Sequence, residues 1–358
     1  MSSTEWGQTG PGYPGGDEQK SRVPGWVKLG ILLLLLIALG WVLLLTIEYL
    51  RTGKPIGDLP GVPGPVVDLF DRTSFKYVKS IDGLDTPMGV AVGRNGKLYV
   101  TETGGERLIH IYDRRWNELG SFAPPDTVPG SRVPIYLAVN PQGDVYVSDR
   151  VAETIFIFSA DGDPKGQVTA PAGFEEWHPL ALAFDSKGNL YVGDVTPDNH
   201  RILVIDPAGN LKLNFGTQGE ADGQFWFPNG IAIDPEGRIF VADSNNGRMQ
   251  AFDEDGNFLF KITRGMSPGD LSMPRGIAID REGRLIIADT SRDAVQVYRV
   301  SETAGSPGDD GPVKFLGFFY GSTGDGVFLQ FPNGLAIDGL GKIYVADRAN
   351  NRVQIWEY

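Results

Sequence analysis

Cysteine is absent from the 358-residue sequence, and histidine occurs only three times. Without cysteine the chain can form neither a disulfide nor a cysteine-based zinc site. A zinc hydrolase site requires about three nitrogen or carboxylate ligands that converge, and of the histidines His110, His178 and His200 only the last two are expected near each other, as a pair. We therefore expect no bound metal and no other cofactor.

An excess of basic residues is also missing, since 32 Lys and Arg stand against 45 Asp and Glu, for a formal net charge of -13. Acidic and basic residues balance within residues 1–60, so the whole excess of acid lies in residues 61–358. Binding to a phosphate backbone depends on cationic side chains. We therefore expect no nucleic acid among the partners.

Charged residues are absent from residues 29–47, a long apolar run near the N-terminus. As a helix, this run would measure about 28 Å at ~1.5 Å per residue, close to the ~30 Å core of a bilayer. Residues 1–25 are polar and rich in glycine, proline and serine, which favours a disordered tail. Residues 51–74 contain several prolines and glycines and suit a semi-rigid stalk. We expect one transmembrane helix within residues 26–50.

A cleaved signal peptide is the main alternative for this run, and a buried soluble helix is a second one. A signal peptide has a shorter apolar region, usually ~7–15 residues, followed by a small-residue cleavage site, and this sequence has neither. The basic residues Lys20, Arg22 and Lys28 precede the run, and Arg51 and Lys54 follow it. Because cytoplasmic flanks carry more Lys and Arg, we expect a cytoplasmic N-terminus and an extracytoplasmic C-terminal body.

A repeat begins after residue 75 and recurs six times. Each copy starts at a proline and carries an alanine four positions later, a glycine nine positions later and an acid fifteen positions later. The prolines are Pro87, Pro134, Pro179, Pro228, Pro274 and Pro332, and the acids are Glu102, Asp149, Asp194, Asp243, Asp289 and Asp347. Apolar segments between glycine turns predict four short strands per copy. Four strands in a period of about 45 to 58 residues are typical of a propeller blade.

Two copies carry the residues of a known repeat. Residues 227–234 read Phe-Pro-Asn-Gly-Ile-Ala-Ile-Asp, and residues 331–338 differ from them only at Leu335. These motifs resemble the NHL repeat, and the resemblance covers about 80% of the chain. It implies an all-β, six-bladed β-propeller over residues 75–358. We expect the apolar segment at residues 75–81 to complete the last blade and close the ring, which would leave no exposed strand edge.

The repeated acids follow the second strand of each copy. A catalytic or metal-binding role is one reading of these acids, but a residue that recurs once per blade favours a role in the repeat itself. Four arginines lie close to the acids in sequence and are the expected partners: Arg107, Arg201, Arg248 and Arg352.

The position after each repeat proline lies at the expected mouth of the central tunnel. In six-bladed enzymes of similar build, such as gluconolactonases and the peptide-amidating lyase, this place supplies metal ligands. Here the six positions hold Met88, Ile135, Leu180, Asn229, Arg275 and Asn333. A divalent metal beside Arg275, without an acid among the six, would be electrostatically poor. The resemblance therefore does not extend to the catalytic residues of those enzymes.

Residue types that commonly bind ligands are nevertheless concentrated at this mouth and its rim. The planar fork of Arg275 suits a carboxylate or a phosphate, and aromatic residues are enriched in binding hot spots. The candidate ligand-binding residues are Arg275, Asn229, Asn333, Tyr136, Trp177, His178, Trp226, Phe227 and Phe331. Packing between blades is the alternative role for the aromatic members of this set.

These observations favour a membrane-anchored, extracytoplasmic propeller that binds a protein, peptide or glycan as a scaffold, adaptor or sensor. No catalytic residue is assigned. The alternative is a metal-dependent enzyme of the lactonase or lyase type that uses the central tunnel.

Overall fold

The computed structural model describes residues 75–125, 131–301, 312–322 and 327–357. These residues belong to one compact unit, residues 71–358. The predicted tail, transmembrane helix and stalk fall within residues 1–74 and lie outside the described residues. Within the ranges that the structure describes, no helix combines the length and the apolar character needed to cross a membrane.

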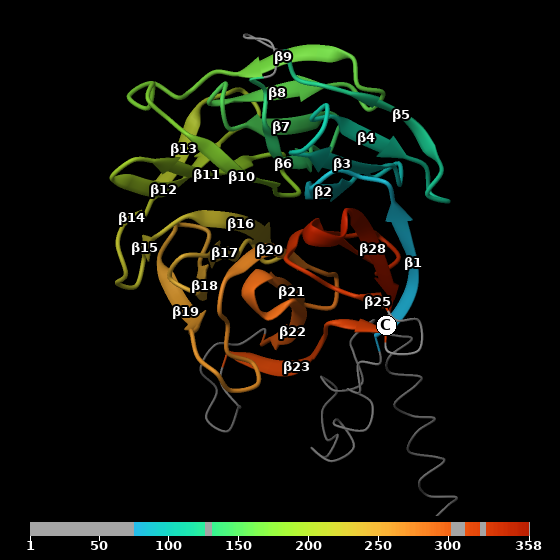
Figure 1. Cartoon of the computed structure of the whole chain (residues 1–358). Coiled ribbons are helices and arrows are strands. Elements are labelled where there is room, and N and C mark those ends of the chain that lie inside the picture. Colours follow the sequence, from blue (N-terminus) through green and yellow to red (C-terminus); the bar gives the residue numbers. More distant parts are fainter. Residues whose placement is uncertain (1–74, 126–130, 302–311, 323–326, 358) are drawn as a thin grey trace, which may run out of the picture. The chain divides into compact units, whose positions relative to one another are not determined.

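Six antiparallel sheets of four strands surround a common axis, and each sheet is one blade (Figure 1). Blade 1 contains β2 (Pro87–Val92), β3 (Leu98–Glu102), β4 (Ile109–Tyr112) and β5 (Glu118–Phe122). Blade 2 contains β6 (Pro134–Val139), β7 (Val145–Asp149), β8 (Thr154–Phe158) and β9 (Pro164–Val168). Blade 3 contains β10 (Pro179–Phe184), β11 (Leu190–Thr196), β12 (Asn199–Ile205) and β13 (Leu211–Phe215).

The second half of the ring repeats this order. Blade 4 contains β16 (Pro228–Ile233), β17 (Ile239–Asp243), β18 (Arg248–Phe252) and β19 (Phe258–Ile262). Blade 5 contains β20 (Pro274–Ile279), β21 (Arg284–Asp289), β22 (Ala294–Val300) and β23 (Val313–Phe319). Blade 6 contains β26 (Pro332–Ile337), β27 (Ile343–Asp347), β28 (Arg352–Glu357) and β1 (Lys76–Asp82). The predicted all-β, six-bladed propeller is confirmed.

Short elements connect the blades. The strands β14 (Thr217–Gln218) and β15 (Gln224–Phe225) form a parallel pair between blades 3 and 4. The strands β24 (Gly321–Ser322) and β25 (Val327–Phe328) form an antiparallel pair between blades 5 and 6. The 3-10 helices η2 (Thr290–Arg292) and η3 (Arg348–Asn350) follow the second strands of blades 5 and 6.

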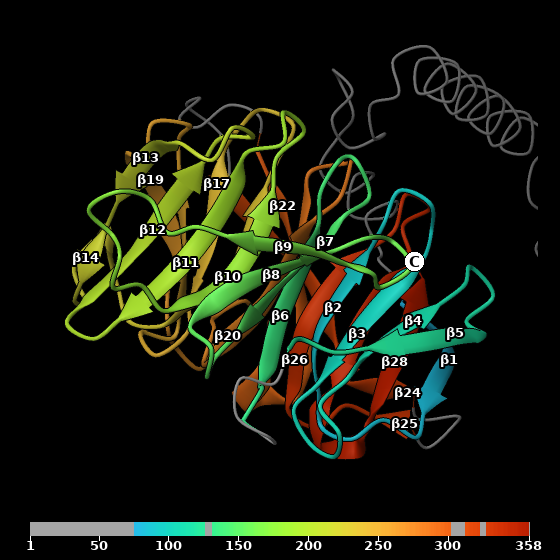
Figure 2. The same cartoon turned by 90° about the horizontal axis from the view of Figure 1, so that it is seen from above.

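The ring closes through β1, which comes from the N-terminal side of blade 1. It pairs antiparallel with β28, the third strand of blade 6, and places Ile81 opposite Val353. Both views show β1 against β28 at the outer edge of this blade (Figure 1 and Figure 2). The predicted closure is therefore confirmed, and β28 has a hydrogen-bonded neighbour on each side.

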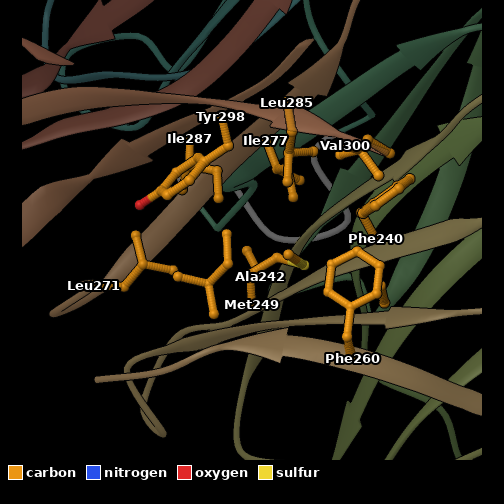
Figure 3. Close-up of a cluster of buried hydrophobic side chains, with 13 residues drawn as sticks. Phe240, Ala242, Met249, Phe260, Leu271, Ile277, Leu285, Ile287, Tyr298 and Val300 are labelled. Atoms are coloured by element: carbon orange, nitrogen blue, oxygen red, sulfur yellow. The ribbon is translucent and has the colours of Figure 1, made fainter. Parts of the chain in front are cut away.

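The hydrophobic core is divided among the blade interfaces. Each of six buried clusters joins two neighbouring blades. Between blades 4 and 5, for example, Phe240 and Met249 pack with Leu285 and Tyr298 (Figure 3). Full burial of such a side chain contributes about 1.5–3 kcal/mol relative to exposure. The blades therefore stabilise one another by face-to-face packing, and each needs both neighbours.

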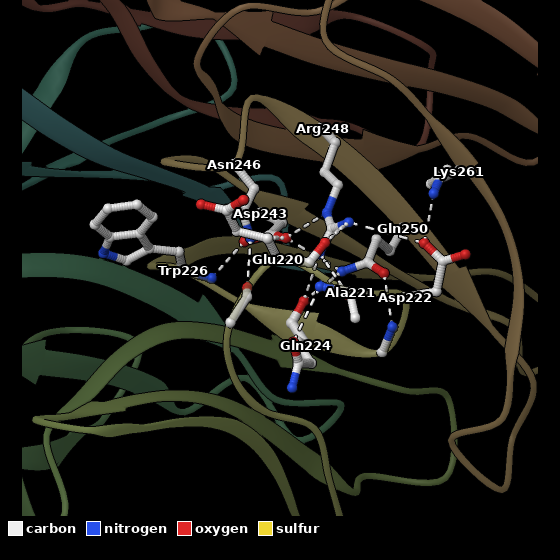
Figure 4. A network of polar contacts seen from close by, with 12 residues as sticks. Glu220, Ala221, Asp222, Gln224, Trp226, Asp243, Asn246, Arg248, Gln250 and Lys261 are labelled. Atoms are coloured by element: carbon white, nitrogen blue, oxygen red, sulfur yellow. Dashed lines mark hydrogen bonds and ion pairs between the residues drawn. The ribbon is translucent and has the colours of Figure 1, made fainter.

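The repeat acids tie the strands of each blade together. In blade 4 the Asp243 carboxylate accepts a hydrogen bond from the backbone N–H of Trp226 at 2.6 Å and from Arg248 Nε at 2.7 Å (Figure 4). Arg201 pairs with Asp194 and Arg352 with Asp347 in the same way. The expected pairing is confirmed for these three arginines, whereas Arg107 donates to the carbonyl oxygen of Arg132. Because these acids hold backbone N–H groups and arginines, they serve the repeat.

Candidate functional site

A cavity of about 560 Å³ opens at the end of the ring where the inner strands begin. Five of the six residues that follow a repeat proline line it, namely Met88, Ile135, Leu180, Asn229 and Arg275. We call this space the mouth cavity. The inner strands place these residues here, because each residue is the second of its strand and β2, β6, β10, β16 and β20 are neighbours in the ring.

The wall of the mouth cavity has two chemically different halves. Met88, Ile135 and Leu180 come from blades 1, 2 and 3 and are apolar. Asn229 and Arg275 come from blades 4 and 5 and are polar or cationic. This division follows from the sequence, because the residues after the first three repeat prolines are apolar and those after the last three are not.

Tyr136 lies at the bottom of the mouth cavity. The equivalent position, two residues after the proline, holds glycine in four blades and alanine in one. Small residues are required there because neighbouring inner strands lie close together: a Cβ on Gly89 would stand 2.7 Å from the carbonyl oxygen of Ile135. Tyr136 also lines a second cavity of about 50 Å³ further along the axis. Its ring therefore lies at the boundary between the two spaces.

The Tyr136 hydroxyl donates a hydrogen bond to Asn333 Oδ1 at 2.7 Å. This contact joins blade 2 to blade 6 across the axis. Burial raises the pKa of Tyr136 to about 12, although the charges of Arg275 and Arg348 act in the opposite direction. The phenol is therefore neutral at physiological pH, and its O–H group can donate the hydrogen bond to Asn333.

Three N–H groups around Tyr136 are buried without an acceptor among the described residues. They belong to Asn333 Nδ2, Arg275 Nε and Arg348 Nε. A buried donor that lacks a partner costs about 1–3 kcal/mol. Among the described residues, the terminal nitrogens of Arg275 donate to Met273 Sδ at 3.8 Å, and a thioether sulfur is a weak acceptor. A ligand that supplies oxygen acceptors would therefore recover part of this cost.

Histidine and acid residues form the opposite rim of the mouth cavity. His178 Nδ1 lies 3.4 Å from Glu153 Oε1, and both residues line the cavity. His200 is buried in the same blade as His178, and burial lowers its pKa. Its neutral Nδ1 accepts a hydrogen bond from the backbone N–H of Phe227 at 3.2 Å. In the part of the chain that the structure describes, no three His, Cys, Asp or Glu residues form a group that could hold a metal.

The nine candidate residues lie in different places. Five line the mouth cavity: Arg275, Asn229, Tyr136, His178 and Phe227. Asn333 is fully buried and contacts the cavity through Tyr136.

The remaining three candidates are aromatic. Trp226 and Phe331 are exposed beside the entrances of β16 and β26, with 42% and 48% of their surface accessible. Trp177 is buried in the cluster between blades 2 and 3. Of these three rings, Trp177 therefore has the alternative role, which is packing between blades.

Two rim aromatics have an unusual backbone conformation. Phe227 and Phe331 immediately precede a repeat proline and have φ values of 58° and 52°. Positive φ is strained for a bulky side chain. Thr86 has a φ of 56° at the same position of blade 1, so three of the six repeat copies adopt this conformation.

Sequence reasoning missed Arg150, Glu153 and Arg348. Arg150 and Glu153 line the mouth cavity, and the charge of Arg348 acts on the Tyr136 hydroxyl. Arg150 and Arg348 each follow a repeat acid directly. The second strand of each blade ends beside the start of the first strand, because the repeat proline is paired with the repeat acid. The position directly after the acid could therefore have been examined as a further mouth position.

The profile of the NHL repeat matches residues 225–252, 271–298 and 329–356. Protein lin-41 of Caenorhabditis elegans is 51% identical over 49 residues, which are 14% of this chain and 4% of that protein. Peptidyl-glycine alpha-amidating monooxygenase A of Xenopus laevis is 30% identical over 143 residues, which are 36% of this chain and 15% of that protein. The chain thus spans only a small part of the length of these curated relatives.

Solved structures show the same fold at low sequence identity. Virginiamycin B lyase from Staphylococcus aureus superposes with a TM-score of 0.54 at 16% identity, over 80% of this chain and 100% of that one. A gluconolactonase from Xanthomonas campestris superposes with a TM-score of 0.55 at 16% identity, over 77% of this chain and 87% of that one. At this identity the similarity concerns the fold alone.

Proposed function

We propose that this chain, a six-bladed β-propeller with NHL repeats, is a membrane-anchored binding module that recognises a protein, peptide or glycan partner outside the cytoplasm. The single observation that carries the proposal is the mouth cavity. Its polar half presents Asn229 and Arg275, and Arg275 Nε is a buried N–H donor that no described residue accepts. Such a surface is suited to recognition, because a partner supplies the missing acceptors.

The rim around the mouth cavity supports the same conclusion. Trp226, Phe227 and Phe331 are exposed at the entrances of two inner strands. Tryptophan and arginine are enriched where a few residues carry most of the binding energy. Membrane anchoring and extracytoplasmic placement rest on the apolar run at residues 29–47 and on the basic residues that flank it.

The proposal is tested by affinity capture with the full-length chain as bait. We expect a partner that binds the wild type and is lost with the double variant Trp226→Ala, Phe331→Ala. Both side chains are exposed, so the double variant should melt like the wild type. Leu340→Ala is the matched control, because this apolar side chain is 88% exposed in the hairpin between β26 and β27, away from the mouth.

Two outcomes would count against a module that binds its partner through the mouth cavity and its rim. One is a partner that the double variant and the wild type capture equally. The other is lactone hydrolysis or peptide cleavage by the wild type that a chelator abolishes and added metal restores. The second outcome would assign the lactonase- or lyase-like alternative.

A further inference from the structure

Three unpartnered donors, on Arg275, Asn333 and Arg348, come from blades 5 and 6, and one of them, Arg275, lines the mouth cavity. Arg275 and Asn333 each follow the proline that starts an inner strand, β20 and β26, and these strands are neighbours in the ring. Arg348 follows Asp347, which is paired opposite Pro332. The charges of both arginines reach the Tyr136 hydroxyl, which is bonded to Asn333. The charges of two guanidinium groups thus act on the same buried hydrogen bond, between Tyr136 and Asn333.

No acid neutralises these two arginines. Neither Arg275 nor Arg348 forms an ion pair in the described part of the chain, whereas Arg201, Arg248 and Arg352 are each paired with a repeat acid. A pair of partly buried, unneutralised guanidinium groups favours an anionic oxygen ligand, which they bind through charge-assisted hydrogen bonds. This local charge stands out against a chain whose net charge is -13.

We propose that the mouth cavity binds the C-terminal carboxylate of a peptide whose last side chain is apolar. This inference rests on the proposed binding function and specifies its ligand. The carboxylate would contact Arg275, which lines the cavity, and the positive charge of Arg348 would stabilise it at longer range. The last side chain would lie against Met88, Ile135 and Leu180, which form the apolar half of the same cavity.

Two features favour a peptide C-terminus, which carries a single negative charge, as the ligand. Tyr136 lies at the bottom of the cavity, so an extended peptide enters with one end and does not pass through. Asp149 and Glu153 also line the cavity. Their negative charges disfavour a dianion such as phosphate more strongly than a carboxylate, because like charges repel at close range.

The test measures binding of two short peptides to the full-length chain by isothermal titration calorimetry. The probes are N-acetyl-Gly-Gly-Leu as the free acid and the same peptide as the C-terminal amide. We expect the free acid to bind at least ~10-fold more tightly than the amide, since loss of one charged contact at a buried site has at least this effect. A free acid that ends in asparagine should bind more weakly than the one that ends in leucine.

The variant Arg275→Met should remove the preference for the free acid. Arg281→Gln is the matched control, because Arg281 is an exposed arginine in the β20–β21 hairpin of the same blade, at the far end from the mouth. Arg348→Gln provides a second test if Arg275→Met melts at a lower temperature than the wild type. Equal binding of acid and amide, or an unchanged preference in both mouth variants, would overturn the proposal.

Inorganic phosphate serves as a separate probe. If phosphate binds in an Arg275-dependent manner while the free-acid peptide does not, the site is a phosphate site and the carboxylate proposal is wrong. If a partner is still captured through Trp226 and Phe331 while acid and amide bind alike, only this inference fails. If the free acid binds selectively but no partner is captured, the carboxylate site stands and recognition through the exposed rim aromatics fails.

Discussion

His110 lies on β4 at the position where blades 4, 5 and 6 carry glutamine on the third strand. The glutamine Nε2 atoms donate to the repeat acids at 3.2, 3.1 and 2.7 Å. His110 Nε2 lies 3.1 Å from Glu102, outside hydrogen-bond geometry, and its Nδ1 lies 2.8 Å from Glu118. His110 therefore takes the place of this glutamine beside the blade 1 acid, Glu102.

This replacement makes blade 1 sensitive to pH. Burial lowers the pKa of His110, but the hydrogen bonds and charges of Glu118 and Glu102 together outweigh it, and the net pKa lies above the usual 6.5. The pKa of His110 is therefore higher in the folded protein than in the unfolded chain. Protonated His110 then stabilises the fold fully below about pH 6.5, and this stabilisation is lost as the pH rises through the pKa of the folded protein.

We expect the variant His110→Gln to lose this dependence. The melting temperature of the wild type minus that of the variant should be larger at about pH 6 than at about pH 9. Thermal melts of both proteins across this range check the prediction. A difference that stays constant with pH would show that His110 is not protonated in the folded protein.

At the scale of single elements, β1 has the largest effect on the rest of the fold. It supplies the outer strand of blade 6 although it precedes blade 1 in the chain. Ile81 on β1 is buried and packs in the cluster that joins blades 6 and 1. Without β1, the edge of β28 would be unpaired, and an unpaired edge is a site for association with other chains.

The variant Ile81→Ala should lower the free energy of unfolding by about 2–5 kcal/mol, the usual cost of truncating a buried isoleucine. Chemical denaturation measures this loss. Lys79→Ala is the matched control on the same strand, because Lys79 is exposed and its loss should change stability by less than ~0.5 kcal/mol. Equal stability of Ile81→Ala and the wild type would contradict a role of β1 in holding the ring closed.

At the scale of the whole molecule, the mouth cavity depends on the closed ring. Its walls come from β2, β6, β10, β16 and β20, and Tyr136 is held across the axis by Asn333 of β26. The six clusters that join the blades therefore position the ligand-binding candidates as well as stabilise the fold. The candidates belong to one site only when all six blades are in place.

The predicted topology can be tested because the chain contains no cysteine. In intact cells, a membrane-impermeant maleimide should label Leu340→Cys and leave Ser3→Cys unlabelled until the cells are lysed. Leu340 is 88% exposed, so its replacement should not disturb the fold. The wild type, which cannot be labelled, is the control. Labelling of Ser3→Cys but not Leu340→Cys in intact cells would reverse the proposed orientation.

The repeat architecture follows from the sequence because its causes are local. A proline that can begin a strand, a glycine that can turn and an acid near an arginine recur at constant offsets. These signals act within one blade, and six copies of them predict six blades. The closing strand was also predictable, because an apolar segment at residues 75–81 stands before the first copy.

The composition of the site could be predicted only in part. The residues after the repeat prolines were identified from the same offsets, and five of the six line the cavity. The sequence did not distinguish Trp177, which packs between blades, from Trp226, which is exposed. Both stand at an inner-strand entrance, and only the packing of the neighbouring blade decides which ring has space to be buried.

By itself, then, the sequence determined the number of blades, the strands within each blade and the residues at the start of each inner strand. The tertiary structure alone decided that Tyr136 contacts Asn333, which lies 197 residues away along the chain. It also decided that Arg275 and Arg348 act on the same hydroxyl. The physical reason is that ring closure brings the inner strands around one axis, and contacts across an axis leave no periodic signal along the chain.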